Sequence, residues 1–436
     1  MPAFQKAQKY VALSAFALCT TFHAATLRAA TTTATAVTTA STSADTAATA
    51  DAPAQDAATP AAAAPAPAAA PTWSVGPIDF SGLVDGYYSF NANHPSPATN
   101  QLRNFDFDAN SFSLNMIKLS MAHSPDPVGF QVDLGFGKAF SNFGLGVTSC
   151  IGTSTGVCDS GNDIHLEQAY VAWKPTKGKG FEADFGEFVT SAGAEVIETM
   201  NNPNYSRSLL FVQMLPYYHM GLRTSMPVTK ADTFGVQIVN GWNNVSDNNS
   251  GKTFGLTNVY TKAKYAWYLN YYVGPENSNT SKGFRNLIDT TLTLTPTAKL
   301  SGYLNYDYLQ NRNAAINPDG TYSTTNLIHQ QGIAAEARYQ ATGTVAFSGR
   351  YEYLADESGA ITQGQIGGSA IKAGLNEFTI TGEYKMAAGL LARLEYRRDG
   401  ADNAIFHKGA NYATSNLVKG QSTVEFGVVA FFGPKR

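Results

Sequence analysis

Residues 128–140 read VGFQVDLGFGKAF, and this stretch alternates apolar side chains with small or polar ones. The apolar positions are Val128, Phe130, Val132, Leu134 and Phe136. Between them stand Gly129, Gln131, Asp133, Gly135 and Gly137. A two-residue side-chain period is that of a β-strand with one apolar and one wet face. The stretch therefore predicts a strand that separates an apolar medium from water.

The same alternation recurs from about residue 76 to the end, and the connections between runs are alternately short and long. The expected strands are 78–90, one that ends near 123, 128–140, 165–173, 181–188, 216–227, 233–242, 253–260, 264–273, 284–294, 299–309, 329–339, 344–354, 375–386, 390–397 and 422–432. This count of about 16 is even, as in bacterial single-chain barrels. The predicted fold is all-β, a transmembrane antiparallel up-and-down β-barrel, with its short turns at the periplasmic rim.

Membrane lipid explains why such a sheet must close, since lipid cannot hydrogen-bond a bare strand edge. The first strand is therefore expected to pair with the last. A barrel of about 16 strands leaves an aqueous lumen, which smaller barrels fill with side chains.

Composition agrees with this prediction. Hydrophobic residues make up 44% of the 436 residues, yet the mean hydropathy is only -0.17. After the N-terminus no apolar run approaches the roughly 20 residues that a membrane helix needs, which excludes a helical membrane protein. The net charge of -3 gives no sign of a nucleic-acid partner.

Two segments precede the expected barrel, which we place at residues 76–436. Lys6 and Lys9 stand before the apolar run Tyr10–Phe22, and small residues follow, so residues 1–30 are predicted to be a secretory signal peptide. Residues 31–75 consist mostly of Ala, Thr, Pro and Ser and are predicted to be a disordered periplasmic linker. This linker is either a tether to the cell wall or a passive spacer.

The mature chain keeps two cysteines, Cys150 and Cys158, in one long loop. In an oxidising compartment they are predicted to form a disulfide, and two unpaired thiols are the alternative. Metal binding would need further ligands that this loop lacks. The sequence predicts no metal and no cofactor.

Charged residues alternate with apolar neighbours along many of the runs. A lipid-facing Arg or Lys near the midplane costs roughly 2–4 kcal/mol, so these residues are expected to face the lumen. They are Asp133, Glu182, Asp184, Arg223, Lys299, Asp307, Glu336, Arg338, Arg350, Glu352, Arg393, Glu395 and Arg397. Either they create a field that selects solutes, or they pair with neighbours and solvate a wet wall.

Two further charge patterns follow from this assignment. Counted with the neighbouring Glu377, Glu383 and Glu425, acids outnumber bases, which favours a weak cation preference. Lys118 falls on the row of Phe112, Leu114 and Met116, which is otherwise apolar. Either a β-bulge or a position at the rim would accommodate it.

Several segments resemble the OmpL-like putative β-barrel porin family. They are HLEQAYVAW at 165–173, FGEF at 185–188, NYSRSLLF at 204–211 and GLR at 221–223. The resemblance implies an outer-membrane channel of unassigned substrate, a porin for passive diffusion of small hydrophilic solutes or ions, surrounded by outer-membrane lipid. A homotrimer is compatible with a barrel of this size.

The end of the chain departs from a common pattern of outer-membrane barrels. Many of them finish on an aromatic residue that the outer-membrane assembly machinery reads. Here Phe431 and Phe432 are followed by the four residues Gly433–Arg436.

The third long loop, Thr190–Leu215, is the candidate for a pore constriction, because in general porins the third external loop folds inward. We expect Glu195, Glu198 and Arg207 to line this constriction, and we expect a short helix at Ala194–Met200. The alternative is a loop packed on the outer rim.

Two other functions stay open. The polar loops would suit a non-conducting surface adhesin or structural barrel. A barrel enzyme is less favoured, because the chain has no Gly-x-Ser-x-Gly, His-Glu-x-x-His or Gly-rich phosphate motif. Its best candidate residue would be His219, between Tyr217 and Arg223.

Overall fold

The structure is a computed structural model that describes residues 73–96, 98–142, 165–316, 322–366, 370–409 and 416–433. The predicted signal peptide, nearly all of the predicted linker, and Cys150 and Cys158 lie outside the described residues. The signal peptide, the linker and the disulfide therefore stay predictions.

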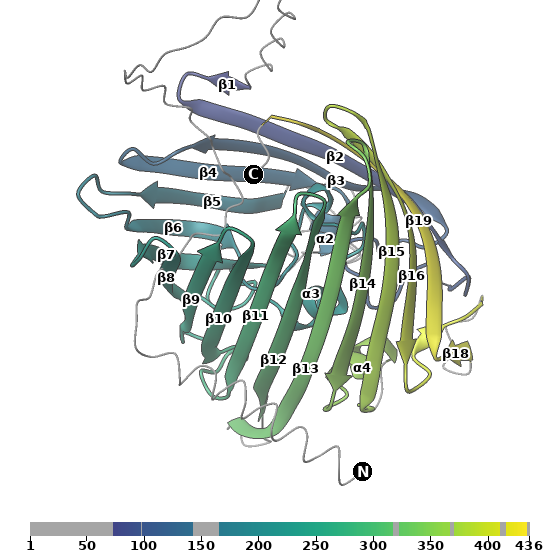
Figure 1. Ribbon diagram of the computed structural model, residues 1–436. Coiled ribbons are helices and arrows are strands. Elements are labelled where there is room, and N and C mark those ends of the chain that lie inside the picture. Colours follow the sequence, from purple (N-terminus) through teal and green to yellow (C-terminus); the bar gives the residue numbers. More distant parts are fainter. Residues whose placement is uncertain are drawn as a thin grey trace, which may run out of the picture.

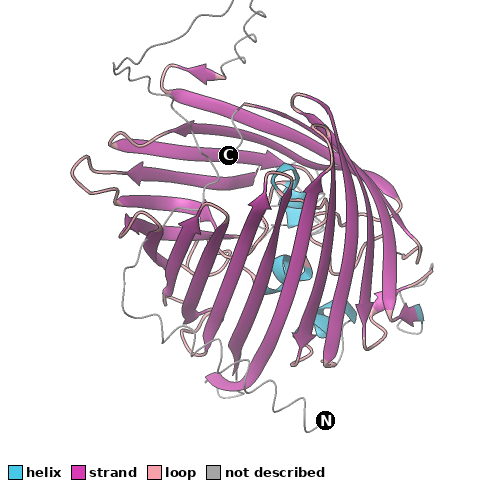
Figure 2. Ribbon diagram, in the orientation of Figure 1, coloured by secondary structure: helices cyan, strands magenta, loops and turns pink. Residues whose placement is uncertain are grey.

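Antiparallel strands make up most of the described chain, and helices are few and short (Figures 1 and 2). The barrel strands are β2 (Ile78–Asn91), β3 (Ser111–His123), β4 (Val128–Phe136), β5 (His165–Trp173), β6 (Glu182–Val189), β7 (Tyr218–Pro227), β8 (Asp232–Val239), β9 (Thr253–Lys262), β10 (Tyr265–Pro275), β11 (Phe284–Thr297), β12 (Leu300–Ile316), β13 (Tyr322–Gln340), β14 (Val345–Asp356), β15 (Ala373–Ala387), β16 (Leu390–Ala401) and β19 (Gly420–Phe432). A two-residue strand, β1 (Ser74–Val75), pairs with the start of β2.

The sheet closes on itself. It contains 17 strands, and without β1 a ring of 16 remains. The last strand β19 pairs with the first, β2, from Thr423 opposite Asn91 to Phe432 opposite Gly82. The predicted closed barrel is thereby confirmed, and its main-chain groups find partners without an open edge, as hydrocarbon requires.

Side-chain exposure follows the predicted alternation. In β14, Phe347, Tyr351 and Tyr353 are exposed, whereas Arg350 and Glu352 between them are buried. The neighbouring strands repeat this pattern, with Ile380 and Leu394 exposed on the same outer face. The outer face is therefore apolar and the inner face carries the charges.

The bulge predicted as one explanation for Lys118 is present. The pairing of β2 with β3 shifts between Asp85 and Gly86, which leaves Asn115 as an extra residue. Because one extra residue exchanges the two faces of a strand, the alternation in β3 changes phase there. Phe112 and Leu114 are exposed, whereas Lys118 is buried inside the barrel.

Two strand predictions were wrong at their ends. The strand expected at 128–140 stops at Phe136, because Gly137 takes a φ of +103° and helix α2 (Lys138–Asn142) follows. The loop expected at 310–328 is largely strand, since β12 runs to Ile316 and β13 starts at Tyr322. The polar residues at the end of β12 and the start of β13 give no alternation signal, although the main chains of the two strands continue to pair there.

Long connections at one rim fold into the barrel. We call residues 92–110 loop 1 and residues 190–217 loop 3. Loop 3 includes the 3-10 helix η1 (Thr199–Asn201) and the helix α3 (Leu209–Met214). Both loops share a buried apolar cluster with α4 (Ala360–Ile366) and with the hairpin of β17 (Phe406–His407) and β18 (Leu417–Val418). Figure 1 shows α3 within the ring of strands. Among the helices of the described residues, none is long and apolar enough to cross a membrane.

The outer face yields a stability prediction. Ile380 and Met386 lie on the same face of β15 and are 48% and 54% exposed, but Ile380 is in the middle of the strand and Met386 is near its end. Ile380→Arg should lower the free energy of unfolding by about 2–4 kcal/mol, and Met386→Arg by about 0–1 kcal/mol. Urea titration in phospholipid vesicles measures both. Equal losses would contradict a membrane-embedded outer face.

Candidate channel constriction

Loop 3 connects the short strands β6 and β7, crosses the lumen and contacts the inner walls of strands far away in the sequence. Its contacts with β14, β15 and β16 involve the charged side chains of these strands. Three arginines and two glutamates there bind the loop, and each of these five side chains is buried.

Arg350 of β14 joins the loop to the wall. Its Nη1 donates to Glu195 Oε1 at 2.6 Å and to the carbonyl oxygen of Ser206 at 2.8 Å. Its Nε donates to Glu377 of β15 at 3.0 Å. Glu195 also accepts a hydrogen bond from the main-chain N–H of Ser208 at 2.6 Å. A buried ion pair with further hydrogen bonds resists opening, because losing one partner leaves an uncompensated buried charge.

The two inward-facing arginines of β16, Arg393 and Arg397, bind main-chain oxygens of the loop. Arg393 donates to the carbonyl oxygens of Thr199 and Asn202, each at 2.6 Å, and Glu383 pairs with it at 2.7 Å. Arg397 donates to the carbonyl oxygen of Arg207 at 2.5 Å. These donors satisfy carbonyl groups that an irregular loop would otherwise bury without partners.

Carboxylates of the wall accept from main-chain N–H groups of the loop. Glu395 accepts from Tyr205 at 2.6 Å and from Ser206 at 3.1 Å. Glu352 accepts from Leu209 at 2.9 Å and from Leu210 at 3.1 Å, the first residues of α3. The first N–H groups of a helix have no partners within it, so an anion there is favourable.

The adjacent part of the wall, beyond β19, also holds the loop. Lys118 forms ion pairs with Glu198 of the loop, with Glu167 at 2.7 Å and with Asp133 at 3.1 Å. Asp85 of β2 accepts hydrogen bonds from Thr199 Oγ1 at 2.6 Å and from the Tyr205 hydroxyl at 2.7 Å. Loop 3 is thus fixed to strands on both sides of β19, namely β14 to β16 and the pair β2 and β3.

Arg207 turns back onto its own loop. It donates to the carbonyl oxygens of Val196, Ile197 and Tyr205, and its guanidinium lies 4.6 Å from the centre of the Phe105 ring of loop 1. Complete burial lowers the pKa of this guanidinium from its ordinary value. Its contacts therefore shape the loop.

The helix expected at Ala194–Met200 was wrong. Only Thr199–Asn201 forms a 3-10 turn, and the α-helix of the loop is α3 at Leu209–Met214. Ser208 caps α3, since its Oγ accepts from the N–H of Phe211 at 3.0 Å. This Ser followed by a run of apolar residues is a start signal that sequence reasoning missed.

The other residues predicted to face the lumen are distributed around the wall. Asp133 lies with Lys118, and Asp307 stands opposite Asp289 of β11. Glu182 pairs with Lys174, and Arg338 with Glu383. Glu336 is buried on β13 next to Ala335 and Ala337. Lys299 is exposed in the turn before β12, at the rim. Reasoning from the sequence missed Asp85, although it alternates with Val84 and Gly86 in β2.

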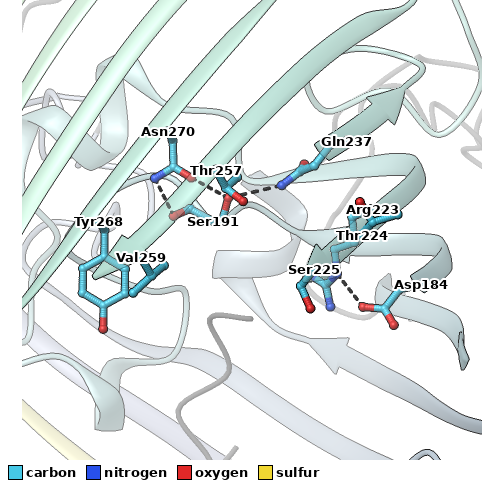
Figure 3. Close-up of a pocket in the computed structure, with 10 residues that line it drawn as sticks. All are labelled: Asp184, Ser191, Arg223, Thr224, Ser225, Gln237, Thr257, Val259, Tyr268 and Asn270. Carbon is cyan, nitrogen blue, oxygen red and sulfur yellow. Dashed lines mark hydrogen bonds and ion pairs between the residues drawn. The ribbon is translucent and has the colours of Figure 1, made fainter. Parts of the chain in front are cut away.

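A pocket lies against the inner wall of β6 to β10, away from the strands β14 to β16 (Figure 3). Its lining residues are Asp184, Ser191, Arg223, Thr224, Ser225, Gln237, Thr257, Val259, Tyr268 and Asn270. Asp184 and Arg223 form an ion pair at 2.7 Å, and the remaining residues are uncharged.

Close packing beside the pocket requires glycine at one position of β8. Gly235 of β8 stands between Ser225 of β7 and Thr257 of β9, both of which line the pocket. A Cβ on Gly235 would lie 2.4 Å from Thr257 Oγ1 and 2.6 Å from the carbonyl oxygen of Thr224. The wall can therefore hold no side chain at this position without displacing its neighbours.

His219 lies in an apolar environment. Its ring stacks on Tyr272 with 5.1 Å between the ring centres, and its Nδ1 is 3.0 Å from the carbonyl oxygen of Gly241. Within the described residues, no group of three or more His, Cys, Asp or Glu side chains is arranged to hold a metal ion.

The barrel is similar to solved outer-membrane proteins that share little sequence with it. The channel DcaP of Acinetobacter baumannii has 9% identity and a TM-score of 0.52, over 81% of this chain and 97% of that chain. The trimer form of OmpT of Vibrio cholerae has 12% identity and a TM-score of 0.51, over 81% of this chain and 99% of that chain. An anion-selective porin from Comamonas acidovorans has 10% identity and a TM-score of 0.50, with the same coverage. At such identities the similarity shows the fold alone.

Comparison with curated proteins gives no match. A family model described as "Putative beta-barrel porin-2, OmpL-like" matches residues 77–432, which are almost the entire closed barrel. This agrees with the outer-membrane location that the apolar outer face and the closed sheet require. The chain belongs to the OmpL-like putative β-barrel porin-2 family.

Proposed function

We propose that this protein is an outer-membrane porin in which loop 3 narrows the lumen to a passage along β6 to β10. The observation that supports the proposal most directly is the asymmetry of the interior. The charges of β14 and β16 bind loop 3, whereas the pocket on the opposite wall is lined by uncharged side chains and the single ion pair of Asp184 with Arg223. A small hydrophilic solute would therefore pass between loop 3 and this wall.

The three loop residues predicted to line the constriction would act mainly by positioning it. Glu195 and Arg207 are buried in contacts with the wall and the loop, and Glu198 is bound to Lys118 with 13% of its side chain exposed. Because their charges are compensated, they contribute little to a field in the passage. We therefore propose weak ion selectivity, with the small cation preference that an excess of inward acids would give.

Several surrounding features belong to the same proposal. A signal peptide would export the chain, and the outer-membrane assembly machinery would insert it. The trimer form of OmpT of Vibrio cholerae supports a homotrimer. A non-conducting surface barrel is the second candidate, because the buried apolar cluster of loops 1 and 3 fills part of the lumen. The apolar packing of His219 gives no support to an enzyme.

Conductance tests the proposal. Purified protein in a planar lipid bilayer under a KCl gradient should give discrete conductance steps and a small reversal potential of the sign for cation preference. The weak selectivity follows from the paired charges of the interior. As a control, a shift in electrophoretic mobility on heating shows that the purified protein is folded. Folded protein without conductance would exclude the porin and favour the surface barrel.

The clamp on loop 3 gives a second prediction. Arg350→Met leaves Glu195 buried without its cation and leaves Glu377 with only the more distant Arg397, which should weaken the attachment of loop 3 by about 3–5 kcal/mol. We expect larger and noisier single-channel conductance, because the loop no longer holds one position in the lumen. Arg398→Met is the matched control, since Arg398 is exposed on the outer side of β16 and contacts Ser422 instead of the loop. Unchanged conductance in Arg350→Met would contradict the constriction.

A further inference from the structure

Arg223 is an inward arginine that takes no part in the clamp on loop 3. It lies on β7 directly opposite Asp184 of β6, and its Nε donates to Asp184 Oδ2 at 2.7 Å. Its guanidinium carbon is 4.8 Å from the centre of the Tyr170 ring and 4.6 Å from that of Phe188. One carboxylate and two rings therefore fix the orientation of the guanidinium.

The terminal nitrogens of Arg223 differ from those of the clamp arginines. Within the described residues, Arg223 has one hydrogen-bond acceptor, at Nε, and its side chain is 13% exposed. The side chains of Arg350 and Arg397 are 0% and 1% exposed, and loop oxygens accept from their terminal nitrogens. Since Arg223 lines the pocket, its terminal N–H groups are accessible from there.

The other polar groups of the pocket are mostly engaged with one another. Ser191 Oγ donates to Asn270 Oδ1 at 2.7 Å, and Asn270 Nδ2 donates to the carbonyl oxygen of Ser191 at 3.1 Å. Gln237 Nε2 donates to Ser191 Oγ at 3.3 Å. Figure 3 shows this group together with Tyr268 and Val259 at one end of the pocket, and Arg223 with Asp184 at the other.

This arrangement matches a ligand with an anionic head and a less polar body. A guanidinium offers parallel N–H donors that a carboxylate accepts in pairs. Tyr268 and Val259 supply an apolar surface for the body. Asp184 balances the charge of Arg223, which keeps binding weak, and a channel needs sites that a solute can leave.

We propose that Arg223 forms a binding site for the carboxylate of small organic acids, with the apolar part of the acid against Tyr268 and Val259. The inference rests on the proposed porin function and adds the solute class. Inorganic phosphate lacks the apolar part, so it would bind this site less well than an organic acid of similar size.

The probes are benzoate, its neutral isostere benzamide, and inorganic phosphate. Each is added to single channels in KCl, and the dwell times of current interruptions are measured. Benzoate should interrupt the current, whereas benzamide and phosphate should do so much less. Arg223→Gln should weaken benzoate binding by at least about tenfold, because a charge-assisted pair is lost. Asp184→Asn should strengthen it, because the competing carboxylate is gone.

Controls separate this site from a general effect of positive charge. Arg338→Gln removes another inward arginine, which pairs with Glu383 at 2.8 Å outside the pocket, and should leave benzoate binding unchanged. Arg223→Lys keeps the charge without the planar fork and should bind benzoate with intermediate strength. It also replaces Arg223→Gln if that variant does not fold.

The outcomes distinguish this inference from the porin function. Conductance steps without selective block by benzoate would leave the porin intact and overturn the carboxylate site. Equal effects of Arg223→Gln and Arg338→Gln, or stronger block by phosphate, would also overturn it. If the folded protein does not conduct, the porin fails, and benzoate binding is measured by saturation-transfer NMR in detergent micelles. Loss of that signal in Arg223→Gln would support the site, and an unchanged signal would overturn it.

Discussion

The structure depends on one constraint, which is that hydrocarbon offers no hydrogen-bond partners to the main chain. The strands must therefore pair all the way around, as β19 does with β2. Closure divides every strand into an outer face against lipid and an inner face against water. Charged side chains near the middle of the membrane are then favoured on the inner face, which concentrates them in the lumen.

These inner charges find partners in loop 3 instead of remaining free in the lumen. A loop inside a barrel must bury many main-chain groups, and each of them needs a hydrogen bond. Arg393 and Arg397 supply donors for its carbonyl groups, while Glu352 and Glu395 accept from its N–H groups. The side chains of the wall thus supply the hydrogen-bond partners that a neighbouring strand supplies to the main chain of a strand in a sheet.

The sequence predicted the strands well because the two-residue period is a local signal. It marked one change of phase, because Lys118 stands on an otherwise apolar row, but it could not distinguish the bulge at Asn115 from a position at the rim. It also could not foresee which residues hold loop 3. Glu195 and Arg350 are 155 positions apart, and only the curvature of the closed sheet brings them together. The charges on the strands were visible, but their partners depended on the path of a loop without periodicity.

The position of loop 3 also explains why the two sides of the lumen differ in chemistry. On the side of β14 to β16, large charged residues reach the loop and leave little space. On the side of β6 to β10, the inner face carries Gly235 and Gly255, where an added Cβ would collide with Thr257 and Tyr272. A wall that does not hold the loop needs few charges, and apart from Asp184 and Arg223 the residues that line the pocket are uncharged. In this wall the pair of Asp184 and Arg223 therefore stands out as the place where a passing solute meets a charge.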